Sequence, residues 1–140
     1  VPTPFTGDHE PDISYVEAAT RSVLPYLKEG DLYIIESTSP VGTTEKMASL
    51  IFSERPELRD KLAIAYCPER VLPGNVIYEL VHNDRVIGGI NETSTDRAIA
   101  FYSQFVKGEL QRPHRRDVQA HRKLVARRAD CLRQRAVVDL

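Results

Sequence analysis

Three short segments carry the residue types that could do chemistry. The first, VPTP, contains Thr3, and the second, ESTSPVGTT at residues 36–44, offers several hydroxyl groups just before an apolar helical stretch. The third, CPERVLPG at residues 67–74, places Glu69 directly after a proline. Unpaired amides and the dipole at a helix start favour an anionic group such as a pyrophosphate. A carboxylate at the end of a strand can face a ligand or act as a base.

Each of these segments also has an ordinary structural explanation. Ser and Thr are common helix caps, so residues 36–44 fit a capping loop about as well as a ligand site. For PER, a surface ion pair between Glu69 and Arg70 is the simpler interpretation when the residues stand alone. The histidines show no metal-ligand spacing with one another, so the sequence predicts no metal site.

The apolar pattern predicts a first helix from Ile13 to Leu27. Asp12 stands at its start as an N-cap, and Gly30 stands just past its end, where a left-handed conformation is common. Pro25 removes an amide donor from the last turn. We therefore expect the helix to bend there.

Short apolar runs predict three strands, at residues 32–35, 62–66 and 85–89. Two further helices are expected, one over Met47 to Glu54, which Pro56 closes, and one over residues 93–106. This order predicts an α/β fold with a largely parallel sheet. Ligands of such sheets lie outside the carboxyl ends of the strands, which is where the three polar segments fall.

Composition excludes several classes of protein. The 140 residues are 41% hydrophobic, and no apolar run comes near the ~20 residues that a membrane span requires. The two cysteines, Cys67 and Cys131, lack CxxC spacing, so neither a disulfide framework nor a zinc site is indicated. We interpret both as incidental thiols. A reducing, cytoplasmic setting fits this cysteine usage.

The segments VPTPF, IESTSPVGTTEKM, IAYCPERVLPG and NDRVIGG, in this order, resemble the UDP-glucose/GDP-mannose dehydrogenase family. The last two most resemble the members that act on UDP-N-acetyl-D-mannosamine. The resemblance runs from Val1 to about Gly108. It implies that residues 1–109 are the second half of a Rossmann-like NAD-binding domain with a largely parallel sheet.

The resemblance also implies an activity and a set of site residues. Such enzymes oxidise the C6 alcohol of a nucleotide sugar to a carboxylate in two NAD-dependent steps, through aldehyde and thioester stages. Thr3 and Thr38 would lie along NAD, and Thr38 would also help to hold a catalytic water. Glu69 would be the catalytic acid/base or water-orienting carboxylate. The loop against the UDP-sugar would consist of Glu69, Arg70, Val71 and Leu72.

Three parts of the family pattern are not found among the 140 residues. They are the Gly-rich phosphate-binding turn, a Lys-x-x-x-Asn pair and the GGHC segment that carries the nucleophile. In addition, Pro73 stands where some members have an acidic cofactor contact. We therefore expect no turnover by this chain alone. The implied partners are a UDP-sugar and, for full-length members, further copies of the same chain, with no nucleic acid and no membrane.

The last thirty residues differ from the rest in charge. Residues 1–110 carry ten Lys plus Arg and seventeen Asp plus Glu, whereas residues 111–140 carry nine and three. With suitable codons for Gln111 to Leu124, reading one base later gives NARTAEMCKLTEN, which resembles the absent Lys-containing motif. The hypothesis is that residues 110–140 are a basic tail translated out of frame.

A different class of function competes with this interpretation. The chain could be a non-catalytic α/β binding module whose basic tail binds nucleic acid or a protein partner. Residues 111–140 contain no aromatic side chain to stack on bases, which disfavours nucleic acid. Their apolar positions fit a weakly amphipathic helix, so partner binding stays open.

Overall fold

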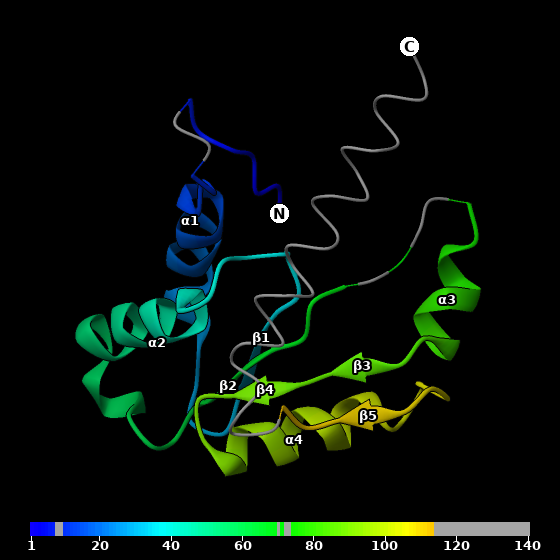
Figure 1. Cartoon of the computed structure of the whole chain (residues 1–140). Coiled ribbons are helices and arrows are strands. Elements are labelled where there is room, and N and C mark those ends of the chain that lie inside the picture. The colour runs from blue at the N-terminus through cyan, green and yellow to red at the C-terminus, as the bar shows by residue number, and fades with distance from the viewer. Residues whose placement is uncertain (8–9, 70, 72–73, 114–140) are drawn as a thin grey trace.

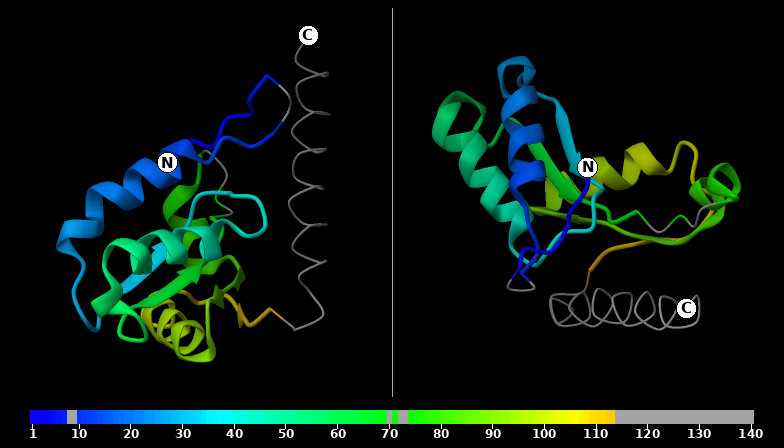
Figure 2. Two further views of the ribbon diagram at one scale, coloured as in Figure 1. Left: turned by 90° about the vertical axis from the view of Figure 1, so that its left-hand side faces the viewer. Right: turned by 90° about the horizontal axis from the view of Figure 1, so that it is seen from above.

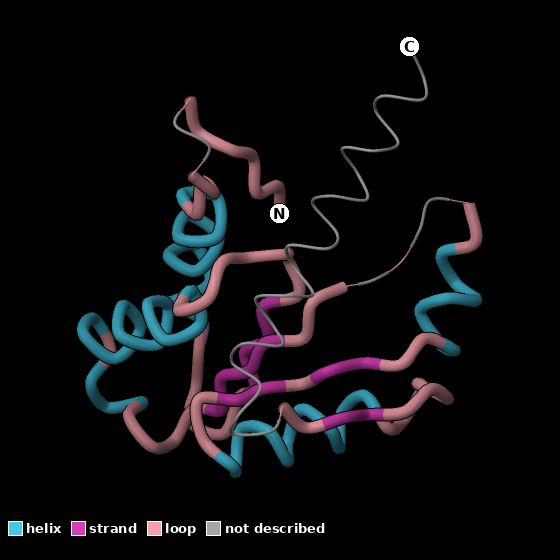
Figure 3. The backbone as a smooth tube through the Cα atoms, in the orientation of Figure 1, coloured by secondary structure: helices cyan, strands magenta, loops and turns pink. Residues whose placement is uncertain are grey.

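A computed structural model describes residues 1–7, 10–69, 71 and 74–113 (Figure 1). Figure 3 colours the chain by secondary structure. The helices are α1 (Ser14–Val23), α2 (Thr43–Glu54), α3 (Val76–His82) and α4 (Glu92–Tyr102), with 3-10 turns at η1 (Leu24–Tyr26) and η2 (Pro56–Leu58). The strands are β1 (Leu32–Ile35), β2 (Ala63–Tyr66), β3 (Arg85–Val86), β4 (Gly88–Gly89) and β5 (Leu110–Gln111).

The sheet confirms the predicted α/β fold. β1 and β2 pair in parallel, with Leu32 opposite Ala63, and β3 and β5 also pair in parallel. The prediction of one strand over residues 85–89 is wrong in detail, because β3 and β4 pair with different neighbours and β4 runs antiparallel to β2. The chain passes from one neighbour to the other at Ile87, whose amide donates to the Gln111 carbonyl at 2.9 Å.

Helices cover both faces of β1 and β2, which explains why both strands are apolar runs (Figure 2). Successive side chains of a strand point to opposite faces. Ile35 packs with Val16 of α1 and Met47 of α2, while Ile34 packs against the cluster that includes Ala98 of α4. The central strands are therefore held between two helical layers.

The first helix is shorter than predicted at both ends. Its N-cap is Ile13, without a side-chain cap, and not the predicted Asp12, whose carboxylate accepts a hydrogen bond from the Ser14 amide at 2.9 Å one residue earlier. Helix α1 ends at Val23 and not at the predicted Leu27, and the 3-10 turn η1, which contains Pro25, follows it directly. Gly30 has φ of +90°, a conformation that favours glycine.

Two features of the fold differ from the expected elements. Helix α3 was not predicted, and the helix expected over residues 93–106 ends at Tyr102. The amides of Phe105 and Val106 donate to the Tyr102 carbonyl, so the chain turns there and returns toward β5. At the return, a Cβ on Gly108 would lie 2.4 Å from the Asn83 carbonyl oxygen, so glycine is needed.

Helix α4 starts directly against β4. Asn91 caps the helix by accepting from the Ser94 amide at 2.8 Å, and the Ser94 hydroxyl accepts from the Ile64 amide at 3.1 Å. A Cβ on Gly89 would lie 2.4 Å from the Thr95 amide nitrogen. Only glycine at this position allows α4 to begin so close to the sheet.

Candidate functional site

The three polar segments meet at the carboxyl ends of β1 and β2. The Glu69 amide donates to the Glu36 carbonyl at 3.0 Å, so the loops that follow the two strands run side by side. The terminal ammonium group of Val1 donates to the Ser37 hydroxyl at 2.9 Å, which brings the segment containing Thr3 to the same edge. The parallel sheet thus gathers the predicted residues where a ligand is expected.

The hydroxyl groups of residues 36–44 do not cap α2. Helix α2 follows Gly42, which has φ of +90°, and no described side chain caps its start. The Ser39 hydroxyl donates to the Ser37 carbonyl at 2.9 Å, and the Thr43 hydroxyl donates to the Pro40 carbonyl at 2.8 Å. Thr38 is exposed on the surface of this loop. The capping interpretation is therefore wrong for these groups, and Thr38 faces outward.

The Glu69 side chain is half-buried, and its carboxylate accepts a hydrogen bond from the Val71 amide. This bond fixes the start of the loop that the resemblance assigns to the UDP-sugar. Val71 is half-buried as well. Arg70 and Leu72 lie outside the described residues, so the expected ion pair between Glu69 and Arg70 and the position of Leu72 stay predictions.

A buried charged cluster lies under this edge of the sheet, and sequence reasoning missed it. Arg85 is only 3% exposed, and its guanidinium lies 4.9 Å from the centre of the Tyr102 ring. It donates to the Cys67 sulfur at 3.7 Å and lies 4.0 Å from the Glu36 carboxylate, which also accepts from the Tyr102 hydroxyl. An arginine at the start of a strand gives no sequence signal for burial.

Burial governs the acid–base behaviour of this cluster. It raises the pKa of the Cys67 thiol above its ordinary value, although the Arg85 guanidinium acts in the opposite direction. The pKa of Tyr102 is also raised, first by burial and then by its hydrogen bond to the Glu36 carboxylate. Both side chains therefore stay protonated near neutral pH. Cys67 is an inert buried thiol, in agreement with its interpretation as incidental.

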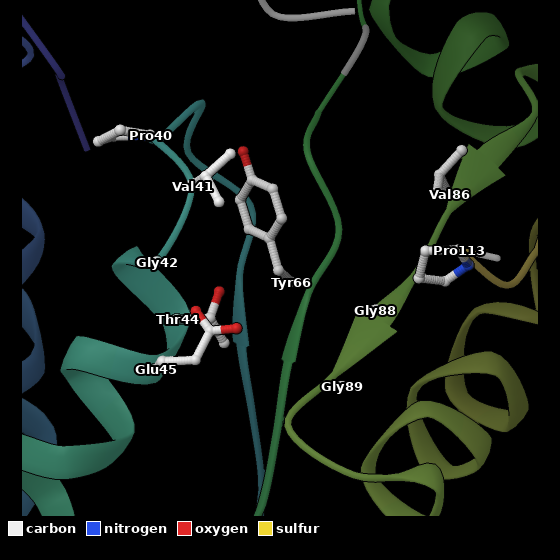
Figure 4. A pocket seen from close by; sticks show the side chains of 10 residues that line it. All are labelled: Pro40, Val41, Gly42, Thr44, Glu45, Tyr66, Val86, Gly88, Gly89 and Pro113. Carbon is white, nitrogen blue, oxygen red and sulfur yellow. The ribbon is translucent and has the colours of Figure 1, made fainter. Parts of the chain in front are cut away.

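A cavity of about 230 Å³ lies between the start of α2 and β4 (Figure 4). Tyr66 stands between these two walls, and Glu45 contributes a carboxylate. The lining residues are Pro40, Val41, Gly42, Thr44, Glu45, Tyr66, Val86, Gly88, Gly89 and Pro113. Neither Thr38 nor Glu69 belongs to this lining. The predicted site residues thus form an open edge beside the cavity.

The described ranges hold no group of three or more His, Cys, Asp or Glu side chains that fits a metal ion. No helix within the same ranges has the length and apolar character needed to cross a membrane. The donors at the loop edge are hydroxyl groups and backbone amides.

Comparison with known proteins identifies close relatives. The chain is 56% identical over 117 residues to UDP-N-acetyl-D-mannosamine dehydrogenase of Escherichia coli K12, covering 78% of this chain and 28% of that protein. The UDP-N-acetyl-D-mannosamine dehydrogenase structure from Pyrococcus horikoshii matches with a TM-score of 0.71 at 44% identity over 79% of this chain and 26% of that one. The structure of UDP-N-acetyl-mannosamine dehydrogenase from Staphylococcus aureus matches with a TM-score of 0.75 at 37% identity. The match covers 83% of this chain and 29% of that one.

The chain thus spans little more than a quarter of the length of these relatives. Residues 1–106 match the NAD binding domain of the UDP-glucose/GDP-mannose dehydrogenase family, which confirms the resemblance seen in the sequence and gives NAD as the cofactor of the domain. The fold of the described residues is shared with solved nucleotide-sugar dehydrogenases. This chain therefore belongs to the UDP-glucose/GDP-mannose dehydrogenase family.

Proposed function

We propose that this chain is part of a cytoplasmic, NAD-dependent UDP-N-acetyl-D-mannosamine 6-dehydrogenase. The complete enzyme would oxidise the C6 alcohol of the UDP-sugar to a carboxylate in two steps and would assemble as a homo-oligomer. The observation that carries the proposal is that the loop after β1, which contains Glu36 and Thr38, meets the loop after β2, which contains Glu69 and is called the PER loop below. The Glu69 amide donates to the Glu36 carbonyl at 3.0 Å. The 56% identity to the Escherichia coli relative supports the choice of sugar.

The proposed roles are those that the family resemblance implies for these side chains. Thr3 and Thr38 line the NAD site, and bound NAD supplies the hydride acceptor for the oxidation. The exposed Thr38 hydroxyl helps to orient a water, and the Glu69 carboxylate holds or accepts a proton at the reacting centre. Glu69, with Arg70, Val71 and Leu72, forms the contact to the UDP-sugar.

The first test is a titration of the isotopically labelled chain with NAD and with UDP-N-acetyl-D-mannosamine, followed by NMR. We expect amide shifts to change at Thr38 with NAD, and at Glu69 and Val71 with the UDP-sugar. Thr38→Val should weaken NAD binding about tenfold, because one hydrogen bond to a ligand is lost. Exposed positions on α4 supply matched controls, Thr93→Val and Glu92→Gln.

The sugar assignment needs a competition between nucleotide sugars. UDP-N-acetyl-D-mannosamine should displace UDP-glucose. Glu69→Gln should weaken the binding of both nucleotide sugars, whereas Glu92→Gln should weaken the binding of neither. Shift changes confined to residues away from the β1 and β2 carboxyl ends would contradict the proposal. We also expect no NADH from this chain alone, so measured turnover would refute that part.

We further propose that residues 1–109 are a partial NAD-binding domain and that residues 110–140 are a basic tail translated out of frame. The end of the family match at residue 106 supports this boundary. Sequencing the DNA across codons 105–115 tests the proposal. A nucleotide string that cannot encode KLTEN in the next frame rules it out.

A further inference from the structure

Arg85 is the most deeply buried charged residue that the structure describes. Its side chain is 3% exposed, and among the described atoms its Nε has no hydrogen-bond partner. An apolar side chain of similar volume often gives equal or greater stability at such a position. Its contacts therefore call for an explanation beyond stability.

The two terminal nitrogens of Arg85 connect the start of the loop after β2 with the helix that follows this loop. Nη1 donates to the sulfur of Cys67 at 3.7 Å, and Nη2 donates to the carbonyl oxygen of Leu80 in α3 at 3.2 Å. Glu69 lies between these two contact points in the chain. A planar guanidinium can make both contacts at once because its donors point in fixed, divergent directions.

Arg85 also reaches the neighbouring loop through Glu36. Nη1 lies 4.0 Å from the Glu36 carboxylate, which the Tyr102 hydroxyl also contacts. The Glu36 carbonyl in turn accepts the Glu69 amide at 3.0 Å. Arg85 therefore contacts the first residue after β1 and the first residue after β2, as well as the helix that follows the PER loop.

We propose that Arg85 is a positioning residue that fixes the loop carrying Glu69, and so sets where the Glu69 carboxylate meets the UDP-sugar. The part concerning the UDP-sugar rests on the proposed function. Arg85 acts through Cys67, Leu80 and Glu36 and does not contact the ligand. Removing it loosens the loop while the core under α4 stays packed.

The main experiment compares Arg85→Met with Arg97→Met in the 140-residue chain. Met keeps most of the side-chain volume and removes the donors. Arg97 is the matched control because both of its terminal nitrogens also donate, in its case to the backbone carbonyls of Gly30 and Asp31 at the opposite end of β1. The readout is amide hydrogen exchange at Glu69 measured beside thermal melting.

In Arg85→Met, we expect exchange of the Glu69 amide to accelerate by about tenfold or more, as for opening of a local segment. The amide of Ile64 in β2 and the melting temperature should stay close to those of the unchanged chain. Arg97→Met should leave the Glu69 amide unchanged. For Arg85→Lys, the exchange rate of the Glu69 amide should lie between those of the unchanged chain and Arg85→Met, because one ammonium group cannot donate to both Cys67 and Leu80.

A second variant keeps the proposal testable if Arg85→Met fails to fold. Glu36→Gln removes the charge that faces Arg85 at a side chain that is 49% exposed, and keeps an oxygen that can accept from the Tyr102 hydroxyl. We expect about threefold faster exchange at Glu69. Unchanged exchange in both variants would overturn the proposal, and so would uniform acceleration across β1 and β2 with a lower melting temperature.

Ligand binding separates this proposal from the proposed function. Arg85→Met should weaken UDP-N-acetyl-D-mannosamine binding about tenfold and leave NAD binding within about twofold, a split that a general loss of stability would not produce. If the unchanged chain binds no UDP-sugar, the proposed function fails. The exchange rate at Glu69 then still decides whether Arg85 positions the loop.

Discussion

The two ends of the paired strands β1 and β2 are each tied by an arginine, but in different ways. At the amino ends, Arg97 donates to the carbonyls of Gly30 and Asp31, and the Gly30 amide donates to the Lys61 carbonyl at 2.8 Å. At the carboxyl ends, the buried Arg85 contacts side chains of the two following loops. Both ends have backbone hydrogen bonds between the strands, but the arginine contacts only backbone carbonyls at the first end and two side chains at the second.

This difference separates stability from function within one small sheet. Backbone contacts at the amino ends need no particular side chains in the turns that they join. The side-chain contacts at the carboxyl ends are made by Arg85 from the buried side of the loops. The surfaces of the loops that carry Thr38 and Glu69 therefore stay accessible to a ligand. We expect substitutions at the two ends to affect different measurements.

The largest expected effect comes from displacing helix α4, which carries both Arg97 and Tyr102 and therefore supports both ends of the paired strands. Gly89→Ala places a Cβ 2.4 Å from the Thr95 amide nitrogen, which forces α4 away from β4. Overpacking of this kind costs about 3 kcal/mol of unfolding free energy. Urea denaturation measures it. Gly7→Ala is the control, since nothing lies within 4 Å of its Cβ, and an equal loss in both variants would refute the explanation.

The next prediction sharpens the contrast between the two arginines. Arg97→Met removes two hydrogen bonds to carbonyls and should lower the unfolding free energy by about 1–2 kcal/mol. Arg85→Met should lower it by less, because the replaced side chain is buried with an unsatisfied donor. The same denaturation curves check both variants. A larger loss for Arg85→Met would show that both arginines serve mainly stability.

A smaller effect is expected from Tyr102→Phe. The change removes the hydroxyl that donates to the Glu36 carboxylate and keeps the ring under the Arg85 guanidinium. Because that carboxylate is partly solvated, we expect a loss of about 0.5–1 kcal/mol. Thermal melting gives the magnitude. Tyr26→Phe, at a ring that is 77% exposed, should cost nothing measurable.

The smallest prediction concerns the carboxylates of Asp12 and Glu57. The pKa of Asp12 is lowered by its hydrogen bonds from Ser14, and the pKa of Glu57 is lowered chiefly by its hydrogen bond from Arg55. A lowered pKa stabilises the folded state above the ordinary value of the group. That contribution is lost as the pH falls through the lowered value.

Salt should distinguish these two carboxylates. Raising the ionic strength from about 0.01 M to about 1 M shortens the screening length from ~30 Å to ~3 Å. We expect the pKa of Glu57 to move back toward its ordinary value, since its partner is a charged guanidinium. The pKa of Asp12 should move less, because its partner Ser14 is neutral. Titration by carbon-detected NMR measures both, and equal shifts would contradict the assignment of causes.

The sequence predicted the elements whose signals are local. The apolar run LYII became β1 over the expected residues, whereas the first helix ends at Val23, before the predicted Leu27, and gives way to a 3-10 turn that contains Pro25. Helix α3 escaped prediction because its apolar side chains are not buried, with Ile77 80% exposed. Periodicity detects a helix only when one of its faces packs against something.

The site was predictable to the level of loops and no further. The carboxyl-end rule placed the Thr38 and Glu69 loops at one edge, and the Glu69–Glu36 hydrogen bond shows that they are neighbours. Arg85 was not predictable. It is buried only because Cys67, Tyr102 and Leu80, from three separate elements, surround it, and no local pattern encodes such a meeting.

Gly89 carries a consequence for how this family of sequences can vary. The space above it is set by the start of α4, and the same helix supplies Tyr102, on which the Arg85 guanidinium lies. A lineage that replaces this glycine must shift the helix, and the aromatic platform moves with it. We therefore expect position 89 to covary with residues 85 and 102 among members of the family.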